Sequence, residues 1–279
     1  MLQDSTFDYK ATIAHNYYAT YSTNSSPIPF YNSDGTLAGK IEQTGFPFFT
    51  DDGLYLFLPG GSSFAKLESD GSIAWTYENY APITAFSTSA FGCVAGFADG
   101  KVVSFANDGT IDQQFEPAGS NYPVILGVAL SDSGNFVACL CGQDRQRFVL
   151  ARKHNAHTEI LYHEYLEDEV TRQVLLMFDK SEKNVYYDYA GGLGIVNTKT
   201  LKNDHLALPG KILSLKEAEN MIFALSREGE ICTVAIIQPF ACHAGSFSFK
   251  ATHAFIAVKD NKLFVGRDGS ISRMDIAEK

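Results

Sequence analysis

The chain has 279 residues, of which 45% are hydrophobic and 19% are charged, so it can bury a sizeable core and is not expected to be disordered. Its formal net charge of −10 argues against a nucleic-acid partner and against broad attachment to anionic lipid. No run of 18 apolar residues is present, so the sequence predicts no membrane-spanning helix.

The first residues, MLQDSTFDYK, do not have the pattern of a signal or transit peptide. Two interpretations stay open: a cytoplasmic protein, or a chain that begins after a removed signal or membrane tether. Five cysteines (Cys93, Cys139, Cys141, Cys232 and Cys242) leave at least one thiol unpaired within the chain. Most of them lie on apolar strands, so we interpret them as small buried hydrophobes, not as a disulfide framework.

One phrase recurs along the first part of the chain: an alternating apolar run, then Asp-Gly, then another alternating run. It is centred on Asp34-Gly35, Asp70-Gly71 and Asp108-Gly109, and the glycines are 36 and 38 residues apart. Asp-Gly between alternating runs predicts a tight hairpin, because the turn needs positive φ. A unit of about 40 residues with four short strands is typical of a β-propeller blade.

The predicted blades follow one another without a domain boundary, so we expect one all-β propeller domain over residues 1–279. In chain order they span residues 10–42, 46–78, 83–116, 124–165, 174–208, 212–250 and 254–276. Residues 163–177 are interpreted as a strand, an acidic loop and a strand. Six or eight blades remain open, depending on the division of residues 163–208.

The last predicted blade is one strand short, whereas residues 3–8 precede the first blade. We therefore expect this N-terminal segment to supply the outer strand of blade seven. Such closure would remove an exposed sheet edge.

The phrase from Leu67 to Trp75, LESDGSIAW, resembles the repeat of quinoprotein-like (PQQ-like) and WD40-like propellers, in which a Gly-containing turn leads into a strand with Trp. Trp occurs once here, and the Gly-His and Trp-Asp signatures of WD40 repeats are absent. The resemblance implies the fold. By analogy with bacterial assembly scaffolds of this kind, it favours an extracytoplasmic location, with a membrane tether upstream of the chain as one form of it, over the cytoplasm.

No motif for catalysis, metal or cofactor binding is convincing. His154 and His157 have a spacing that could ligate a metal, but they fall in a predicted turn with no third ligand at a set distance. Cys242-His243 is interpreted as loop. Gly192-Leu-Gly194 lacks the third glycine and the following helix of a dinucleotide loop. We therefore predict a protein that is not an enzyme and has no cofactor.

The connections between blades and the turns between second and third strands should emerge on one face of the ring. They carry six candidate partner-binding residues: Tyr80, Tyr122, Arg145, Arg147, Arg172 and Gln173. Tyrosine and arginine are enriched in interface hot spots. The alternative is an ordinary rim, with tyrosines against prolines and arginines paired to Glu164, Glu167, Asp168 or Glu169.

The leading functional hypothesis is a monomeric scaffold that presents this face to a protein or peptide, within a bacterial envelope assembly. The rival is a small-ligand binder or enzyme that uses the central channel. A third, weaker interpretation is a structural subunit of a larger assembly.

Overall fold

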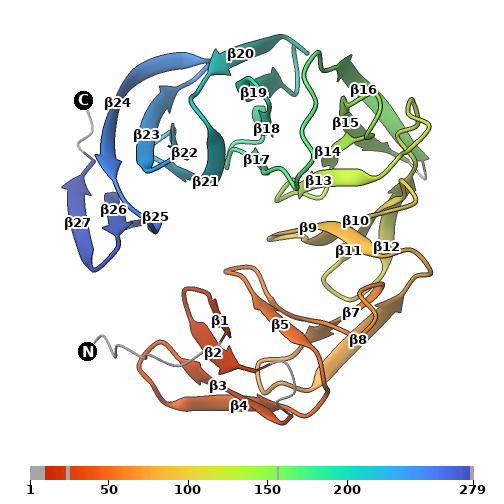
Figure 1. Cartoon of the computed structure of the whole chain (residues 1–279). Coiled ribbons are helices and arrows are strands. Elements are labelled where there is room, and N and C mark those ends of the chain that lie inside the picture. Colours follow the sequence, from red (N-terminus) through yellow and green to blue (C-terminus); the bar gives the residue numbers. More distant parts are fainter. Residues whose placement is uncertain (1–9, 23–25, 156, 277–279) are drawn as a thin grey trace.

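The structure is a computed structural model, and it describes residues 10–22, 26–155 and 157–276. Seven antiparallel sheets follow one another around a central axis and form a ring (Figure 1). Six sheets have four strands, and the last has three in the described part of the chain. This confirms the predicted all-β propeller with seven blades.

Within each blade the strands run from the axis outward in sequence order. The first strands are β1 (Lys10–Ile13), β5 (Phe46–Phe49), β9 (Ile83–Ser89), β13 (Ile125–Leu130), β17 (Leu176–Phe178), β21 (Lys211–Ala218) and β25 (Ala254–Lys259). The second strands are β2 (Tyr17–Tyr21), β6 (Leu54–Phe57), β10 (Gly92–Phe97), β14 (Phe136–Cys141), β18 (Asn184–Tyr189), β22 (Met221–Glu228) and β26 (Lys262–Arg267). The third strands are β3 (Ile28–Asn32), β7 (Ser63–Leu67), β11 (Val102–Ala106), β15 (Arg147–His154), β19 (Gly192–Asn197), β23 (Ile231–Gln238) and β27 (Ser270–Asp275). The fourth strands are β4 (Leu37–Ile41), β8 (Ile73–Glu78), β12 (Ile111–Phe115), β16 (His157–Tyr165), β20 (Asn203–Ala207) and β24 (Cys242–Lys250).

The second strands of the middle blades are apolar on both faces because each blade is covered on two sides. Every residue of β10 is buried, and so are five of the six in β14. A strand that packs on both faces is a near-continuous apolar run instead of an alternating one. The outermost strand β8, by contrast, has only exposed and half-buried residues.

Six hydrophobic clusters hold the ring together, each between two successive blades. The cluster between blades two and three is the most aromatic. The ring of Phe64 meets the rings of Trp75, Phe86 and Phe105 edge to face at 5.0–5.6 Å. Edge-to-face pairs add to the free energy that burial itself contributes.

The repeated Asp-Gly turns have a local hydrogen bond that explains the sequence pattern. The Asp70 carboxylate accepts from the main-chain N of Ser72 at 2.8 Å, and Asp108 accepts from that of Thr110 at 2.9 Å. The pKa of the Asp70 carboxyl is lowered chiefly by the Ser72 hydroxyl and then by this main-chain bond, and the pKa of Asp108 is lowered chiefly by the main-chain bond from Thr110. Gly71 and Gly109 have φ of +93° and +88°, which an L side chain rarely adopts.

The same turns also join neighbouring blades. A Cβ on Gly109 would lie 2.8 Å from Cγ of Trp75, which belongs to β8 of the preceding blade. One blade earlier, Gly71 packs against the main chain of Lys40 in β4. Each glycine therefore satisfies a turn and a close contact between blades at once.

On the same face, the turns between first and second strands are linked by carboxylates. A carboxylate of one blade accepts from a main-chain N of the preceding blade. Four such bonds are 2.6–3.1 Å long: Asp51 with His15, Asp132 with Ala90, Glu182 with Ser133, and Glu217 with Lys180. These carboxylates fix the angle between neighbouring blades.

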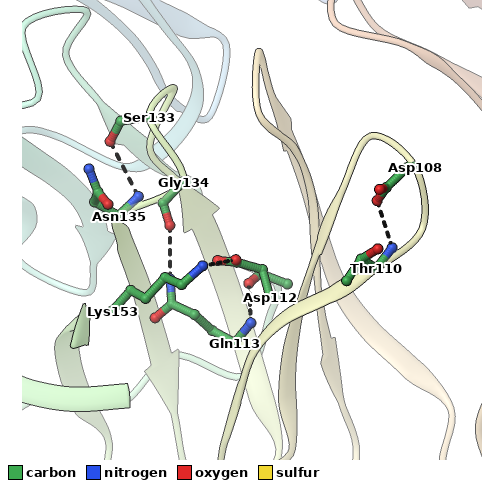
Figure 2. A network of polar contacts seen from close by, with 9 residues as sticks. Asp108, Thr110, Asp112, Gln113, Ser133, Gly134, Asn135 and Lys153 are labelled. Carbon is green, nitrogen blue, oxygen red and sulfur yellow. Dashed lines mark hydrogen bonds and ion pairs between the residues drawn. The ribbon is translucent and has the colours of Figure 1, made fainter. Parts of the chain in front are cut away.

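Polar side chains strengthen the joint between blades three and four (Figure 2). Gln113 on β12 donates from Nε2 to the main-chain oxygen of Gly134 at 2.9 Å and is buried. Lys153 on β15 forms an ion pair with Asp112 on β12. A hydrogen bond to a buried amide constrains this joint more than a surface ion pair does.

The structure corrects the expectation for Cys242 and His243, agrees with that for the buried cysteines, and does not describe the segment expected to close blade seven. Cys242 and His243 are not loop but begin β24, where His243 pairs with Ile237. Four cysteines are buried as predicted, and Cys242 is exposed because it starts an outer strand. Residues 3–8, expected to close blade seven, fall outside the part of the chain that the structure describes.

Replacing Gly109 with Ala tests whether the Asp-Gly turns join the blades. The new Cβ would strain the turn and displace Trp75, so we expect the free energy of unfolding to fall by about 3 kcal/mol. The control is Gly60→Ala, at φ +97° with no atom within 4 Å of the added Cβ. It should cost about 1 kcal/mol, the strain alone. If denaturant titrations show equal losses of unfolding free energy for the two variants, the contact of the Gly109 turn with Trp75 does not help to join the blades.

Candidate partner-binding face

The blade-to-blade connections and the turns between second and third strands lie on one face, as their hydrogen bonds show. Ile83, at the end of the second connection, donates to Gly61 O at 2.8 Å, in a second-to-third turn. Pro82 O in turn accepts from Ala98 at 2.9 Å, beside the corresponding turn of blade three. The connection is thus held between the turns of two successive blades.

The loop that precedes blade four is fixed by Asp144, and it presents Tyr122. The Asp144 carboxylate accepts from the Ser120 hydroxyl and, at 2.8 Å, from Nδ2 of Asn121. The Ser120 hydrogen bond is the main reason that the pKa of Asp144 falls to about 2. The main chain of Tyr122 is bonded to Ser120 and Gln143, whereas its side chain is 64% exposed. An exposed aromatic on a fixed loop costs little entropy when a partner covers it.

Arg145 and Arg147 meet at one aromatic ring. The guanidinium carbons of Arg145 and Arg147 lie 4.4 and 5.6 Å from the centre of the Tyr165 ring. Arg147 also donates to Pro117 O at 2.8 Å, which anchors the loop before blade four. Arg145 is exposed, so its guanidinium is oriented by the ring and open to solvent.

Arg172 and Gln173 lie at the channel instead. Arg172 donates through both terminal nitrogens to the fully buried Asp188 carboxylate, with the Nη2–Oδ1 contact at 2.9 Å. Burial raises the pKa of Asp188, and Arg172 opposes that rise. Gln173 donates from Nε2 to Thr84 O at 2.6 Å, joining blades five and three.

The six candidate residues therefore divide into two groups. Tyr80, which is 104% exposed, Tyr122 and Arg145 point outward. Arg147, Arg172 and Gln173 have intramolecular partners, and the partner of Arg172 is Asp188, none of the four acids considered from the sequence. Whether the first three bind a partner stays a proposal.

Sequence reasoning missed Tyr165, the ring on which both arginines stack. It ends β16 and pairs directly with Arg147 of β15. The signal was present: an aromatic residue at a strand end in register with an arginine on the neighbouring strand. It was not used because the register across the long β15–β16 hairpin depends on where its turn falls.

The channel contains a cavity of about 340 Å³ between the first strands of blades three to six. Most of the residues that line it are apolar, Lys211 is the only ionisable residue among them, and Gln173 is also in the lining. Paired carboxylates, which acid–base chemistry would require, do not line it.

A larger cavity of about 790 Å³ opens on the opposite face, and it does contain carboxylates. Burial raises the pKa of Asp52 and Glu217. Asp51, Asp132 and Glu217 already accept the main-chain bonds described above, so they serve as links between blades. In the described residues no group of three His, Cys, Asp or Glu side chains could hold a metal ion. Nor does a helix in that part of the chain have the length and apolar character to cross a membrane.

The chain belongs to a family of β-propeller proteins, whose model matches residues 1–279. An uncharacterized protein of Treponema pallidum (strain Nichols) is 32% identical over 262 residues, which cover 93% of this chain and 70% of that protein. Among solved structures, BamB from Moraxella catarrhalis matches with a TM-score of 0.62 and 11% identity, over 93% of this chain and 81% of that one. Sqt1 of Saccharomyces cerevisiae matches with a TM-score of 0.65 and 13% identity, over 95% and 82%. These likenesses support the fold, and propellers of this fold commonly mediate protein interactions.

The different roles of Arg172 and Arg145 can be tested by measuring the free energy of unfolding of their alanine variants. Arg172→Ala would leave the buried Asp188 charge unpaired, so we expect the free energy of unfolding to fall by about 3 kcal/mol. Arg145→Ala should cost only about 0.5 kcal/mol, because it removes an exposed cation–π contact. Adding Asp188→Asn to Arg172→Ala should restore part of the loss. Equal costs for the two arginines in denaturant titrations would contradict the division.

The Asp144 carboxyl should titrate near pH 2, below its ordinary value of 3.8. Because the pKa is depressed in the folded state, the carboxylate holds the loop fully above about pH 4 and releases it as the pH falls through 2. NMR titration of the Asp144 carboxyl and the Asn121 amide measures both events. Ser120→Ala should move the pKa back toward 3.8, and an unchanged pKa in that variant would refute the assigned cause.

Proposed function

We propose that this protein is a non-enzymatic interaction scaffold that binds a protein or peptide through the outward residues of its loop face. The observation that carries the proposal is that exposed tyrosine and arginine side chains lie on loops whose main chain is held by hydrogen bonds. Tyr80 and Tyr122 are 104% and 64% exposed, and Arg145 is held over Tyr165 at 4.4 Å. Loops whose main chain is fixed before binding, and an arginine oriented by a neighbouring ring, lower the entropic cost of association.

The neighbouring loops support this proposal by being rigid. Gln146 is buried, and its side chain accepts from Val170 N at 2.8 Å and donates to Val170 O. The side-chain amide of Gln146 thus bonds both main-chain groups of Val170, as a residue of a neighbouring strand would. These two bonds hold the acidic connection before β17 in place. The binding residues therefore stand on a frame that does not need to rearrange.

The rival function, small-ligand chemistry in the channel, is less well supported. The channel cavity of about 340 Å³ lacks paired carboxylates, and Gln173 is already engaged with Thr84. Of the carboxylates that line the larger cavity, Asp51, Asp132 and Glu217 accept from main-chain nitrogens, and Asp52 accepts from the Thr88 hydroxyl at 3.1 Å. Paired carboxylates are therefore absent from the lining of the channel cavity, and those of the larger cavity already have hydrogen-bond partners within the protein.

We further propose a bacterial, extracytoplasmic site of action as part of an envelope assembly. The support is the quinoprotein-like repeat of blade two together with a bacterial relative at 32% identity. Cell fractionation of the source organism with an antibody to the chain tests this location directly.

A triple variant in which Tyr80, Tyr122 and Arg145 are each replaced by Ala tests the proposed partner-binding face. We expect the affinity for the partner to fall at least about 30-fold, the effect of losing a hot spot of 2 kcal/mol. The measurement is affinity capture from lysate and membrane fractions with quantitative mass spectrometry, followed by titration of the captured partner.

The matched control is Lys199→Ala with Lys202→Ala, two exposed lysines near a third-to-fourth turn on the opposite face. Both variants should unfold at the temperature of the original protein within about 1 °C. Unchanged capture by the triple variant, or equal loss with the lysine variant, would refute the proposed face.

A further inference from the structure

The channel cavity of about 340 Å³ lies at the end of the channel that faces the proposed partner. Its lining comes from the first and middle residues of β9, β13 and β21 and from the connection before β17, whereas the last residues of those strands do not line it. The chain enters each of these strands from the loop face, so the cavity belongs to that face. Leu175, which is 38% exposed, and the exposed Lys211 both line it, so solvent reaches the cavity.

The strands that line this cavity are shaped differently from the other first strands. β9, β13 and β21 each have a β-bulge at the cavity, at Thr84, Leu126 and Leu213. The registers of β1, β5 and β25, which do not line the cavity, are unbroken. A bulge bends its strand and turns a side chain to a new direction, and Leu126 and Leu213 both line the cavity. The cavity is therefore built into the inner strands of these blades.

Hydrogen bonds between blades hold one wall of the cavity in place. Val174 donates from its main-chain N to Leu126 O at 3.0 Å, and Gln173 donates from Nε2 to Thr84 O at 2.6 Å. The connection before β17 is thus tied to both β13 and β9. The volume of the cavity is at the lower end of the range for small-ligand pockets, about 300–1,000 Å³. A cavity that is formed before binding adds little reorganisation cost when it is filled.

Lys211 gives the cavity a positive charge, although the formal net charge of the chain is −10. Its amine has no hydrogen bond or ion pair with any residue that the structure describes. The nearby Asp188 carboxylate is already bound by both terminal nitrogens of Arg172. Burial raises the pKa of Asp188, and Arg172 and then Lys211 oppose that rise. Two cations and one carboxylate leave an unpaired positive charge at the cavity, which suits an anionic group.

We propose that the cavity binds the C-terminal residue of a peptide: an apolar side chain fills the cavity, and the terminal carboxylate pairs with the Lys211 amine. This inference rests on the proposed function, because it states which part of the partner enters the loop face. An internal peptide segment has no carboxylate on its main chain, and an acidic side chain would leave the apolar lining unfilled. Lys211 is thus the residue that selects a free C-terminus.

Four acetylated tripeptides, Gly-Gly-X with Ala, Val, Leu or Phe as X, test the proposal as free acids and as C-terminal amides. In calorimetric titrations of the full chain, at least one free acid ending in Val, Leu or Phe should bind saturably, with a Kd below about 2 mM. It should bind at least about tenfold more tightly than its amide, the effect of one charge-assisted hydrogen bond.

Three outcomes of these titrations would overturn the proposal. The first is that no free acid binds, and the second is that acids and amides bind equally. The third is that isocaproate, a branched aliphatic carboxylate without a peptide group, binds as tightly as the best tripeptide. That result would assign the cavity to small carboxylates instead of a peptide terminus.

Substitutions at the cavity test the assigned contacts. Lys211→Met keeps the length of the side chain and removes its charge, so it should weaken the free acid at least about tenfold and leave the amide unchanged. Lys211→Arg should keep the affinity within about threefold, because the charge is retained. Leu175→Trp should fill the cavity and weaken acid and amide alike. The matched control is Lys202→Met, which removes an exposed lysine from the opposite face and should leave both affinities unchanged. Equal losses in Lys211→Met and Lys202→Met would refute the role of Lys211.

The triple variant at Tyr80, Tyr122 and Arg145 separates this inference from the proposed function. None of the three residues lines the cavity, so the free acids should bind that variant as they bind the original chain. Lost partner capture together with retained tripeptide binding supports both proposals. Failure of the tripeptides to bind the original chain overturns the cavity site alone, and unchanged partner capture by the triple variant refutes the outward loop residues alone.

Discussion

The structure depends on one constraint: each blade is a sheet with two apolar faces, and water must be excluded from both. A single four-stranded sheet cannot do this, so each blade is stabilised by its neighbours. The cluster around Phe64 between blades two and three shows the result, since rings from three strands interlock there. A ring is the arrangement in which every blade has two neighbours, provided that the last boundary closes.

The loop face, where we propose that a partner binds, is independent of this requirement. The clusters between blades involve strands, whereas the connections are held by a few polar bonds such as Gln146 with Val170 and Arg172 with Asp188. Those bonds fix the course of each connection without using its outward side chains. The side chains of Tyr80 and Tyr122 are therefore exposed, and Arg145 makes only an exposed contact with the Tyr165 ring. A surface of this kind can change its specificity while the strands stay constant.

The fold could be predicted from the sequence because its signals are local. An Asp-Gly turn between alternating runs specifies a hairpin wherever it occurs, and its regular spacing specifies the blade. The site could be predicted only in part. Which loops share a face follows from topology, but the partner of Arg172 does not, because Asp188 lies within an apolar strand of the next blade. Gln173 and Thr84 are 89 residues apart and meet only across the ring. Contacts of this range depend on the radius of the ring, which no local pattern encodes.

The carboxylate links between the inner turns all run in one direction, from a main-chain N of one blade to an acid of the next. Each hydrogen bond joins two adjacent blades, and none of the four involves a residue at either end of the chain. The molecule is therefore defined by the cyclic order of its blades and not by where the polypeptide starts. Circular permutation, with new ends opened in an exposed connection and the old ends joined by a linker, would preserve every one of these links. Circularly permuted relatives, whose termini lie in different blades, could therefore have the same architecture.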